Sequence, residues 1–301
     1  MDDLVGAGVE VSVLDNLSNG QISNLAEAMT KGRVKVIRGG VNDSDAVKVA
    51  VKGAEVVFHE AAIVNVQQSI REPELTEKVN VGGTKCLLDA CLSEGVKKFV
   101  FASSAAVYGA SKSLPNVETS ELQPQSPYGR SKLEGERLTL RAYSEHGLST
   151  TALRYFNIYG PRSTVGQYSG VINAFAERLI SDRRPVIYGD GGQTRDFVHV
   201  SDVVSASILV ASSPNTSGKV LNVGTGQQIS ILQLAQLEHD ILIGHETPMS
   251  VEYSAARTGD IRDSYADVSL IKNLTGYSSK LQLREGLASY LRWLYPKRKL
   301  Q

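Results

Sequence analysis

The chain has 301 residues, 42% of them hydrophobic and 21% charged, and its 32 Lys and Arg residues balance its 32 Asp and Glu residues. This length can bury a sizeable core in one large or two smaller domains, and a net charge of zero gives no reason to expect nucleic acid or an anionic membrane as a partner. No apolar run approaches the ~18 residues of a membrane-spanning helix, and the acidic Asp2-Asp3 start is unlike a signal peptide. We therefore expect a cytoplasmic protein.

The cysteines and histidines show no metal-binding pattern. Cys86 and Cys91 lie five residues apart on one expected helix, which suits neither a helix-face pair nor a zinc knuckle, so we interpret both as reduced packing residues. No ligand spacing connects the histidines, which are His59, His146, His199, His239 and His245. We therefore expect no metal site.

The first expected strand, Val9 to Leu14, ends in Asp15. A polar loop follows it, with Asn16, Ser18, Asn19 and Gly20. At such a strand end in a dinucleotide-binding fold, an acidic residue accepts the adenosine ribose hydroxyls and repels a 2'-phosphate, which favours NAD over NADP. The alternative is an aspartate that only forms a turn.

A Gly-x-x-Gly-x-x-Gly turn should precede Asp15 by about 20 residues, and the sequence does not contain it. Gly6-Ala7-Gly8 directly precedes the strand, so we interpret it as the end of a helix whose first part is missing. We expect either that the true start lies upstream of Met1 or that the chain comes from a damaged gene. In both cases the chain as given should hold NAD poorly, because glycine backbone and helix-terminal amides bind the pyrophosphate.

Three further short strands are expected, at Val34–Ile37, Glu55–Phe58 and Lys98–Ala102. After the second of these, Ala61 and Ala62 are small enough to let a cofactor approach the backbone, or they simply allow close strand packing. The third strand leads into Ser103 and Ser104. Strands separated by helical patterns predict an α/β fold with a parallel, doubly wound sheet.

Ser126-Pro127 predicts the start of a helix, because a serine hydroxyl caps open amides and proline at the first helical position loses no hydrogen bond. Tyr128 then lies in the first turn, and Lys132 follows four residues later, on the same face. A cation and a helix start both favour phenolate, and together they would have to lower the phenol pKa from ~10 to about 7. Ser104 could share a hydrogen bond with the same substrate hydroxyl.

The Tyr-x-x-x-Lys spacing alone is weak, because it recurs at Tyr108–Lys112 and Tyr295–Lys299. Gly109 indicates a loop at the first copy, and Pro296 opens a basic terminus at the second. We expect neither copy to be catalytic. The surrounding motif distinguishes Tyr128.

A strand followed by Ser103-Ser104, Ala-Val-Tyr-Gly, a loop and Ser-Pro-Tyr-Gly-x-Ser-Lys resembles the extended short-chain dehydrogenase/reductase superfamily. Within it the chain looks like the UDP-glucose 4-epimerase family, and the resemblance runs from Val9 to Trp293. It implies a Rossmann-type NAD domain at residues 1–160 without the first strand and Gly-rich loop. A smaller nucleotide-sugar lobe would occupy residues 161–301, with about 195–224 packing back on the first domain.

The resemblance also implies which residues contact NAD. These are Asp15, Asn16, Ser18, Asn19, Gly20, Ala61, Ala62, Asn80, Ser103, Tyr128, Lys132 and Tyr155. Gly40 stands where the family has an adenine-contacting aspartate, which puts that contact in doubt. Asn80 is expected to open a helix that braces the site, and the helices after Asn80 and Tyr128 would form a homodimer.

For a UDP-sugar substrate the resemblance implies contacts from Ser104, Asn157, Val186, Tyr188, Arg195, Arg257, Asp260 and Ser264. The two arginines would clamp the diphosphate, because a guanidinium gives two parallel bonds to phosphate. Asp260 would accept the ribose hydroxyls, and Val186 and Tyr188 would lie beside the uracil.

The implied reaction is epimerisation at C4 of a UDP-hexose through a transient 4-keto sugar. Tyr128 would take the 4-hydroxyl proton, Lys132 would lower the pKa of Tyr128 and hold the nicotinamide ribose, and Ser104 would orient the hydroxyl. A sugar dehydratase or decarboxylase of the same superfamily is disfavoured, because Ala105 and Ala106 replace its acidic residues. A truncated, non-catalytic relative is a second alternative, supported only by the missing Gly-rich turn.

Ser264 bears on substrate range. Epimerases restricted to UDP-glucose and UDP-galactose often carry a tyrosine four residues after the ribose-binding aspartate, here Asp260. A serine leaves room for a 2-N-acetyl group, which predicts activity on UDP-GlcNAc and UDP-GalNAc as well. The alternative is that Ser264 only caps or turns the chain.

Overall fold

A computed structural model describes residues 1–111, 113–163, 170–256 and 261–297. The chain forms two compact units, each built from separate stretches. The first comprises Met1–Ser103, Ser126–Ala152 and Thr216–Val220, and the second comprises Ser104–Gln125, Leu153–Asn215 and Leu221–Gln301. The boundary expected at Gly160 concerns cofactor and substrate domains and stays a prediction.

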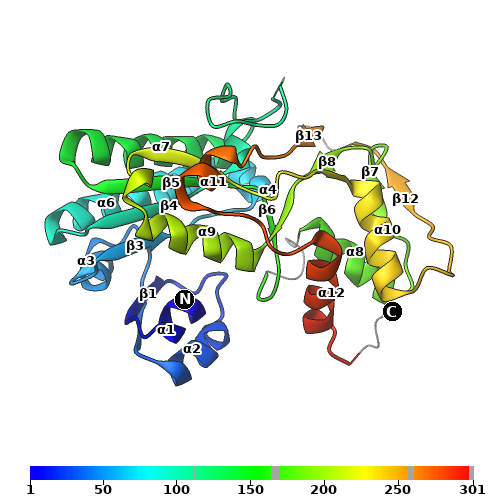
Figure 1. Ribbon diagram of the computed structural model, residues 1–301, viewed down its shortest axis with the longest axis horizontal. Helices are drawn as coiled ribbons and strands as arrows, with labels where there is room; N and C mark the ends of the chain where they lie inside the picture. The colour runs from blue at the N-terminus through cyan, green and yellow to red at the C-terminus, as the bar shows by residue number, and fades with distance from the viewer. Residues whose placement is uncertain (112, 164–169, 257–260, 298–301) are drawn as a thin grey trace. The chain divides into compact units, whose positions relative to one another are not determined.

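Many elements of the first unit are labelled in Figure 1. In chain order they are α1 (Asp2–Gly6), β1 (Val11–Asp15), η1 (Ile22–Leu25), α2 (Ala26–Lys31), β2 (Val34–Arg38), α3 (Ser44–Val51), β3 (Val56–His59), α4 (Val66–Arg71), α5 (Pro73–Glu77), η2 (Lys78–Gly82), α6 (Gly83–Glu94), β4 (Lys98–Ser104), α7 (Pro127–His146), β5 (Ser149–Tyr155) and β10 (Lys219–Val223). The division between the units falls within β4, β5 and β10.

Parallel pairing confirms the α/β prediction for the first unit. β1 pairs with β2 from Val11↔Val34 to Asp15↔Arg38, and β3 pairs with β4, both in parallel. β4 belongs to a four-stranded sheet of order β10-β5-β4-β3, and all of it but Ser104 is buried, as expected of a strand covered on both faces. In the part of the chain that the structure describes, β1 and β2 form a separate two-stranded sheet instead of joining the one sheet expected.

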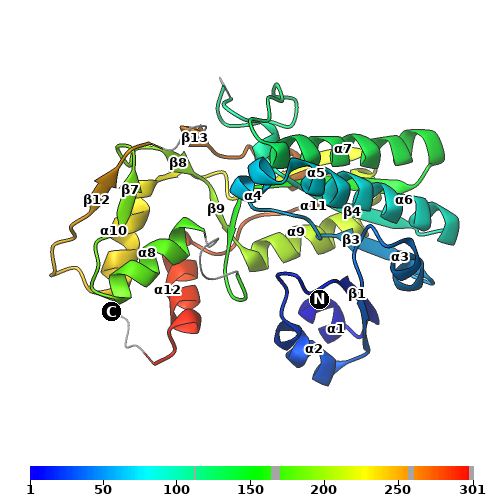
Figure 2. The same ribbon diagram turned by 180° about the vertical axis from the view of Figure 1, so that it is seen from behind.

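Helices α4, α5, α6 and α7 lie side by side (Figure 2). Apolar side chains of α3, α6, α7 and the strands form one core, which contains Val47, Leu87, Leu88, Cys91, Phe99, Phe101, Ala142 and Ala152. Cys91 is fully buried in this core and Cys86 packs against it, which agrees with their interpretation as packing residues.

One predicted helix start is wrong. Asn80 lies inside a continuous helical stretch that begins at Pro73, where proline occupies the first turn of α5. The residues around Asn80, Lys78–Gly82, form a π turn, which widens the helix locally. The predicted strands at 55–58 and 98–102 instead span Val56–His59 and Lys98–Ser104.

The second unit contains η3 (Ala105–Val107), β6 (Asn157–Tyr159), α8 (Val171–Ile180), β7 (Val186–Tyr188), β8 (Thr194–Arg195), β9 (Phe197–His199), α9 (Val200–Ser212), η4 (Pro214–Thr216), β11 (Ile229–Ser230), α10 (Ile231–Leu242), β12 (Glu252–Ser254), β13 (Asp263–Ser264), α11 (Ser269–Thr275) and α12 (Leu283–Leu294). Its strands are short and form three small sheets, of order β11-β8-β13, β12-β7 and β6-β9. Helices α8, α10 and α12 pack around a second apolar core (Figure 1).

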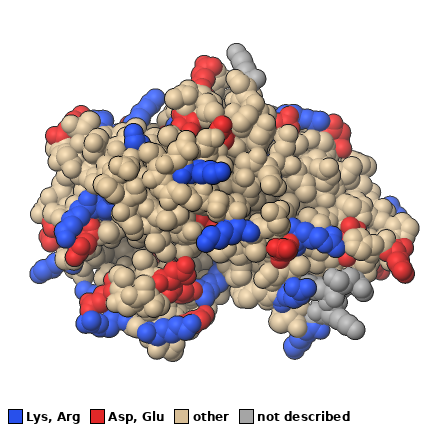
Figure 3. Space-filling view, in the orientation of Figure 1, with Lys and Arg blue, Asp and Glu red and all other residues tan. Residues whose placement is uncertain are grey.

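Surface charges do not segregate on the face shown in Figure 3, where basic and acidic side chains are interspersed. This agrees with the net charge of zero. Among the described residues, no helix combines the length and apolar character that crossing a membrane requires.

The buried carboxylate of Asp196 joins three segments of the second unit. It accepts hydrogen bonds from the amides of Thr225, Gly226 and Ala266, and from the Thr225 hydroxyl at 2.6 Å. Asp196 is fully buried, with 0% of its surface exposed. Because Asp196 directly follows Arg195, these bonds also fix the end of β8.

Asp196→Ala should lower the free energy of unfolding by about 3–5 kcal/mol, because several amides lose a charged acceptor in the interior. Urea unfolding followed by circular dichroism measures this. The control is Asp190→Ala, which removes an exposed carboxylate and should leave stability unchanged within error. Equal effects of the two substitutions would contradict the role given to Asp196.

Candidate active site

Helix α7 begins as predicted, and two serine hydroxyl oxygens accept hydrogen bonds from backbone amides at its start. Ser126 Oγ accepts the amide of Gly129 at 3.1 Å, and Pro127 fills the first position. Ser69 Oγ, from α4, accepts the amide of Tyr128 at 3.1 Å. Both serines are buried. Tyr128 thus sits in the first turn, where the helix dipole favours negative charge.

The carbonyl group of Tyr128 is held as well. Ser131 Oγ donates to Tyr128 O at 2.8 Å, and Asn80 Nδ2 donates to Ser131 Oγ at 2.9 Å. Asn80 also exchanges two hydrogen bonds with the backbone of Ile63, at 2.8 and 3.0 Å. The π turn that contains Asn80 therefore braces the catalytic helix. Its predicted contact with a cofactor stays a prediction.

Lys132 lies inside the protein, with 3% of its surface exposed. Its Nζ donates to Ala102 O at 2.7 Å and lies 6.0 Å from the ring centre of Tyr128. Burial lowers the pKa of Lys132 to about 8, and the carboxylate of Glu60 partly opposes this shift. At neutral pH most of the ammonium is therefore charged, beside Tyr128, as the spacing predicts.

His59 is neutral at physiological pH. Burial lowers its pKa to about 3, and the charge of Lys132 contributes to the shift. Its Nε2 lies 2.9 Å from Thr84 Oγ1, and its ring packs against Phe99 and Phe101. His59 therefore serves packing at the end of β3. No group of three or more potential metal ligands among His, Cys, Asp and Glu occurs in the described parts of the chain.

The two serines at the end of β4 differ in their contacts. Ser103 is 2% exposed, and its Oγ donates to Glu136 Oε1 at 2.5 Å. Ser104 caps η3 through a hydrogen bond from the amide of Ala106 at 3.2 Å. The hydroxyl of Ser103 is thus directed at Glu136, a partner that the sequence analysis missed. Ser104 belongs to the second unit, and its place beside the phenol of Tyr128 stays a prediction.

The loop after β1 fits a dinucleotide. Asp15 Oδ1 accepts the amide of Leu17 at 2.7 Å, and Asn16 Oδ1 accepts that of Ser18 at 3.0 Å. A Cβ at Gly20 would come within 3.0 Å of Asp15 Oδ2, so glycine keeps the space beside this carboxylate open. Asp15 therefore does form a turn, through Oδ1, and this turn leaves Oδ2 for a ligand. Ala61 is exposed and Ala62 half-buried after β3, as a close backbone approach requires.

Tyr155 is 8% exposed, and its hydroxyl lies 3.1 Å from Ser207 Oγ within the second unit. Tyr108, whose motif partner Lys112 lies outside the described residues, is 1% exposed, and its hydroxyl donates to Asn222 at 2.6 Å. Burial raises the pKa of Tyr108 to about 12, so this phenol cannot act as a proton acceptor near neutral pH. It is a packing residue, as expected of a non-catalytic copy.

Several predicted substrate residues come together within the second unit. Ser264 of β13 is the register partner of Arg195 of β8, and Arg195 Nη1 donates to Thr194 O at 2.8 Å. Tyr188 ends β7, and its carbonyl accepts Gln193 Nε2 at 2.7 Å. Besides Ser104, the other members of the set that the structure describes are Asn157, which starts β6, and Val186, which starts β7. Arg257 and Asp260 lie outside the described residues.

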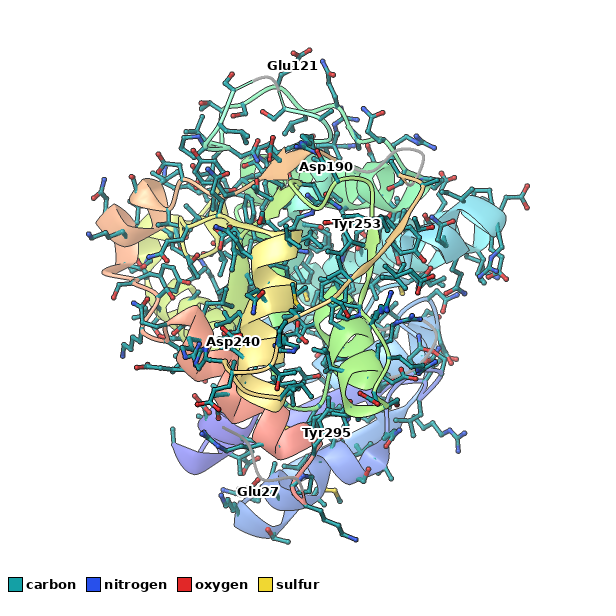
Figure 4. All side chains as sticks on the ribbon, turned by 90° about the vertical axis from the view of Figure 1, so that its right-hand side faces the viewer. Glu27, Glu121, Asp190, Asp240, Tyr253 and Tyr295 are labelled. Carbon is teal, nitrogen blue, oxygen red and sulfur yellow. The ribbon has the colours of Figure 1, made fainter. Side chains whose placement is uncertain are left out.

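The turn after β7 is tied to β13 by an exposed ion pair. Asp190, labelled in Figure 4, accepts Arg262 Nη1 at 2.6 Å and the amide of Gly192 at 2.9 Å. The carbonyl of Arg262 accepts the amide of Thr194 at 2.9 Å and Arg195 Nη1 at 3.3 Å. Arg195 is therefore oriented by backbone from its own strand and from the residue before β13.

A cavity of about 700 Å³ in the second unit contains none of the predicted site residues. It lies beside α10 and is lined by glutamines, Lys272, Arg284 and Asp240, the last of which is labelled in Figure 4. Asp240 is already paired with His245 at 3.1 Å and with Gln236 at 2.8 Å. This cavity therefore does not coincide with the residues that the sequence predicts to bind cofactor or substrate.

Comparison with known proteins shows which family the sequence matches. Residues 1–224 match the family described as NAD dependent epimerase/dehydratase. The chain is 34% identical over 291 residues to the UDP-glucose 4-epimerase of Mycolicibacterium smegmatis, with 96% of this chain and 91% of the relative covered. The matched relatives also include a UDP-N-acetyl-alpha-D-glucosaminuronate decarboxylase and a dTDP-glucose 4,6-dehydratase.

Two solved structures are similar over nearly the whole chain. The UDP-glucose 4-epimerase of Thermotoga maritima, solved with UDP-glucose, has a TM-score of 0.91 and 34% identity, covering 98% of this chain and 94% of that chain. The UDP-N-acetylglucosamine 4-epimerase of Methanobrevibacter ruminantium, in complex with UDP-N-acetylmuramic acid, has a TM-score of 0.91 and 33% identity, covering 98% and 93%. Both confirm the predicted fold.

Replacing Lys132 by methionine should remove a pH dependence of stability. The pKa of Lys132 is about 8 in the folded chain against an ordinary 10.5, so between these values the unfolded chain binds more protons than the folded one. The free energy of unfolding of the parent therefore rises by about 3 kcal/mol as pH increases from 8 to 10.5. Below pH 8 the full cost of burying the charge is present.

Lys132→Met should thus be at least as stable as the parent at pH 7.5, and this advantage should shrink by about 3 kcal/mol towards pH 10.5. Denaturant unfolding at both pH values measures the difference. Lys97→Met, at an exposed lysine one residue before β4, is the matched control. A pH-independent difference between Lys132→Met and the parent would show that the ammonium is not buried as described.

Proposed function

The chain belongs to the NAD-dependent epimerase/dehydratase family, and from this premise we propose that it interconverts UDP-hexoses that differ in configuration at C4. NAD is the cofactor of this family. The observation that supports the proposal most directly is the buried ammonium of Lys132, one helical turn from Tyr128 and 6.0 Å from its ring centre. The similarity to two 4-epimerases over 98% of the chain supports the choice of reaction.

In this proposal Tyr128 is the proton-transfer group. Its phenolate oxygen accepts the proton of the sugar 4-hydroxyl and later returns it. The ammonium of Lys132 and the start of α7 stabilise the phenolate, and Ser104 orients the hydroxyl. When bound, NAD supplies the acceptor and donor of the C4 hydride. Asp15, the alanines after β3 and Lys132 would hold it.

The nucleotide must be held more firmly than the sugar, because the sugar has to present both faces of C4 in turn. We assign this to the second unit, where Arg195 and Arg257 would bind the diphosphate, with Asn157 beside them. Asp260 would accept the uridine ribose hydroxyls, and β7 would lie beside the uracil. The pairing of Ser264 with Arg195 supports a common site for these residues.

A dehydratase or decarboxylase mechanism is less well supported. Elimination of water needs an acid and a base next to the active-site hydroxyl, and the residues after Ser104 are Ala105 and Ala106. Both lie in η3, and neither side chain can transfer a proton. Homodimer formation through the helices after Asn80 and Tyr128, and a cytoplasmic location, remain proposals.

Tyr128→Phe should lower kcat about 10²–10⁴-fold, because the ring still packs but no proton acceptor remains. UDP binding, measured by calorimetry, should be unchanged. The epimerisation assay is run with excess added NAD. Tyr108→Phe is the matched control from the non-catalytic copy of the motif, and it should keep the activity. A Tyr128→Phe variant with most of the parent activity would refute the mechanism.

Ser264→Tyr should reduce kcat/KM for UDP-GlcNAc roughly 100-fold while sparing UDP-galactose, because the larger ring excludes a 2-N-acetyl group. The parent should act on both sugar pairs. Ser264→Ala, which keeps the side chain small, is the control and should behave like the parent. Equal losses on the two substrates, or no N-acetyl activity in the parent, would count against a gate at Ser264.

A further inference from the structure

Glu136 is a buried carboxylate that the proposed reaction does not use. It is 2% exposed, and its Oε1 accepts the hydroxyl of Ser103, itself 2% exposed, at 2.5 Å. Hydrogen bonds from a hydroxyl to a carboxylate are short and roughly twice as strong as neutral ones. The contact joins α7 to β4 inside the first unit (Figure 2).

The position of Glu136 on its helix relates it to the catalytic residues. Tyr128, Lys132 and Glu136 follow each other at intervals of four residues, so they share one face of α7. Along β4 their contacts are consecutive, because Lys132 Nζ bonds Ala102 and Glu136 bonds Ser103. A donor and an acceptor from one helix face thus hold two successive residues of the strand.

Close packing of α7 on β4 makes both bonds possible. A Cβ at Gly135 would come within 2.3 Å of Phe101 Cζ, so only glycine lets the helix approach the strand this closely. Packing alone gives no reason to bury a carboxylate, since an apolar residue of similar volume would avoid its desolvation. The bond to Ser103 is therefore the contribution that distinguishes Glu136 from an apolar core residue.

We propose that Glu136 is a positioning residue for the proton-transfer site: by holding Ser103 it fixes the register of α7 along β4. That register keeps the ammonium of Lys132 on Ala102, and it thereby keeps this ammonium beside the ring of Tyr128. Because Ser104 directly follows Ser103 in β4, the same contact also fixes the backbone at Ser104. The inference rests on the proposed function for its effect on turnover, and Glu136 itself touches no reacting atom.

The test compares two substitutions of the carboxylate. Glu136→Leu removes the acceptor and should lower kcat about 10–100-fold with KM changed less than about twofold, because small displacements of catalytic groups are costly. Glu136→Gln keeps an acceptor oxygen and should restore most of the activity. Should Glu136→Leu fold poorly, Ser103→Ala/Glu136→Leu removes both partners without leaving an unpaired group and should show the same loss.

A matched control breaks a similar tie at the other end of the same strand. Lys98 Nζ donates to Thr216 Oγ1 at 3.0 Å, and both residues are buried. Thr216→Val should lower the melting temperature without lowering kcat. An equal fall in kcat for Thr216→Val and Glu136→Leu would overturn the inference, since it would mean that any loss of stability reduces turnover.

A readout that needs no turnover separates this inference from the proposed function. The titration of Lys132 is followed by NMR of its side chain, assigned with Lys132→Met. Its midpoint should rise in Glu136→Leu, because a displaced ammonium regains water, and it should stay near the parent value in Glu136→Gln. If the parent is inactive but the midpoint of Lys132 rises in Glu136→Leu and not in Glu136→Gln, the proposed function is refuted and the role of Glu136 is supported. An unshifted titration in Glu136→Leu, or a Gln variant that behaves like the Leu variant, would overturn that role.

Discussion

The burial of one ammonium group constrains the first unit more than any other interaction. A charged lysine leaves water only where protein groups replace its hydration, and for Lys132 the carbonyl of Ala102 is such a group. This requires β4 to end facing α7 and requires the helix to lie close to the strand. Ser69 and Ser131 hydrogen-bond the backbone of Tyr128, the residue beside the ammonium, and Asn80 in turn holds Ser131. The same contacts therefore determine how α7 packs on β4 and how Tyr128 and Lys132 are placed.

Local patterns predicted the features that depend on short stretches of sequence. The start of α7 follows from Ser126-Pro127, where the serine caps the helix and proline takes its first position. The common face of Tyr128 and Lys132 follows from their spacing. The family resemblance supplied further residues, and it predicted that the helical segment around Asn80 braces the site.

Long-range contacts could not be predicted in this way. Ser69 reaches Tyr128 across 59 residues and Ser103 reaches Glu136 across 33, and neither serine stands out in its own segment. The start of the helix around Asn80 was misplaced because Pro73 and the π turn extend it, and a π turn has no simple sequence signal. A pattern of alternating strands and helices likewise could not predict that β1 and β2 form a separate sheet.

Both units are assembled from stretches that lie far apart in the chain, and this affects their synthesis. The first unit includes Thr216, which bonds Lys98 of β4 and Thr151 of β5, and β10 follows it beside β5. From the end of α7 at His146 to Thr216 the ribosome must add 216 − 146 = 70 residues, which takes several seconds at about 5–20 residues per second. Once β5 is made, and until β10 follows, β5 presents an unpaired edge, and such an edge is a binding site for chaperones and for other nascent chains.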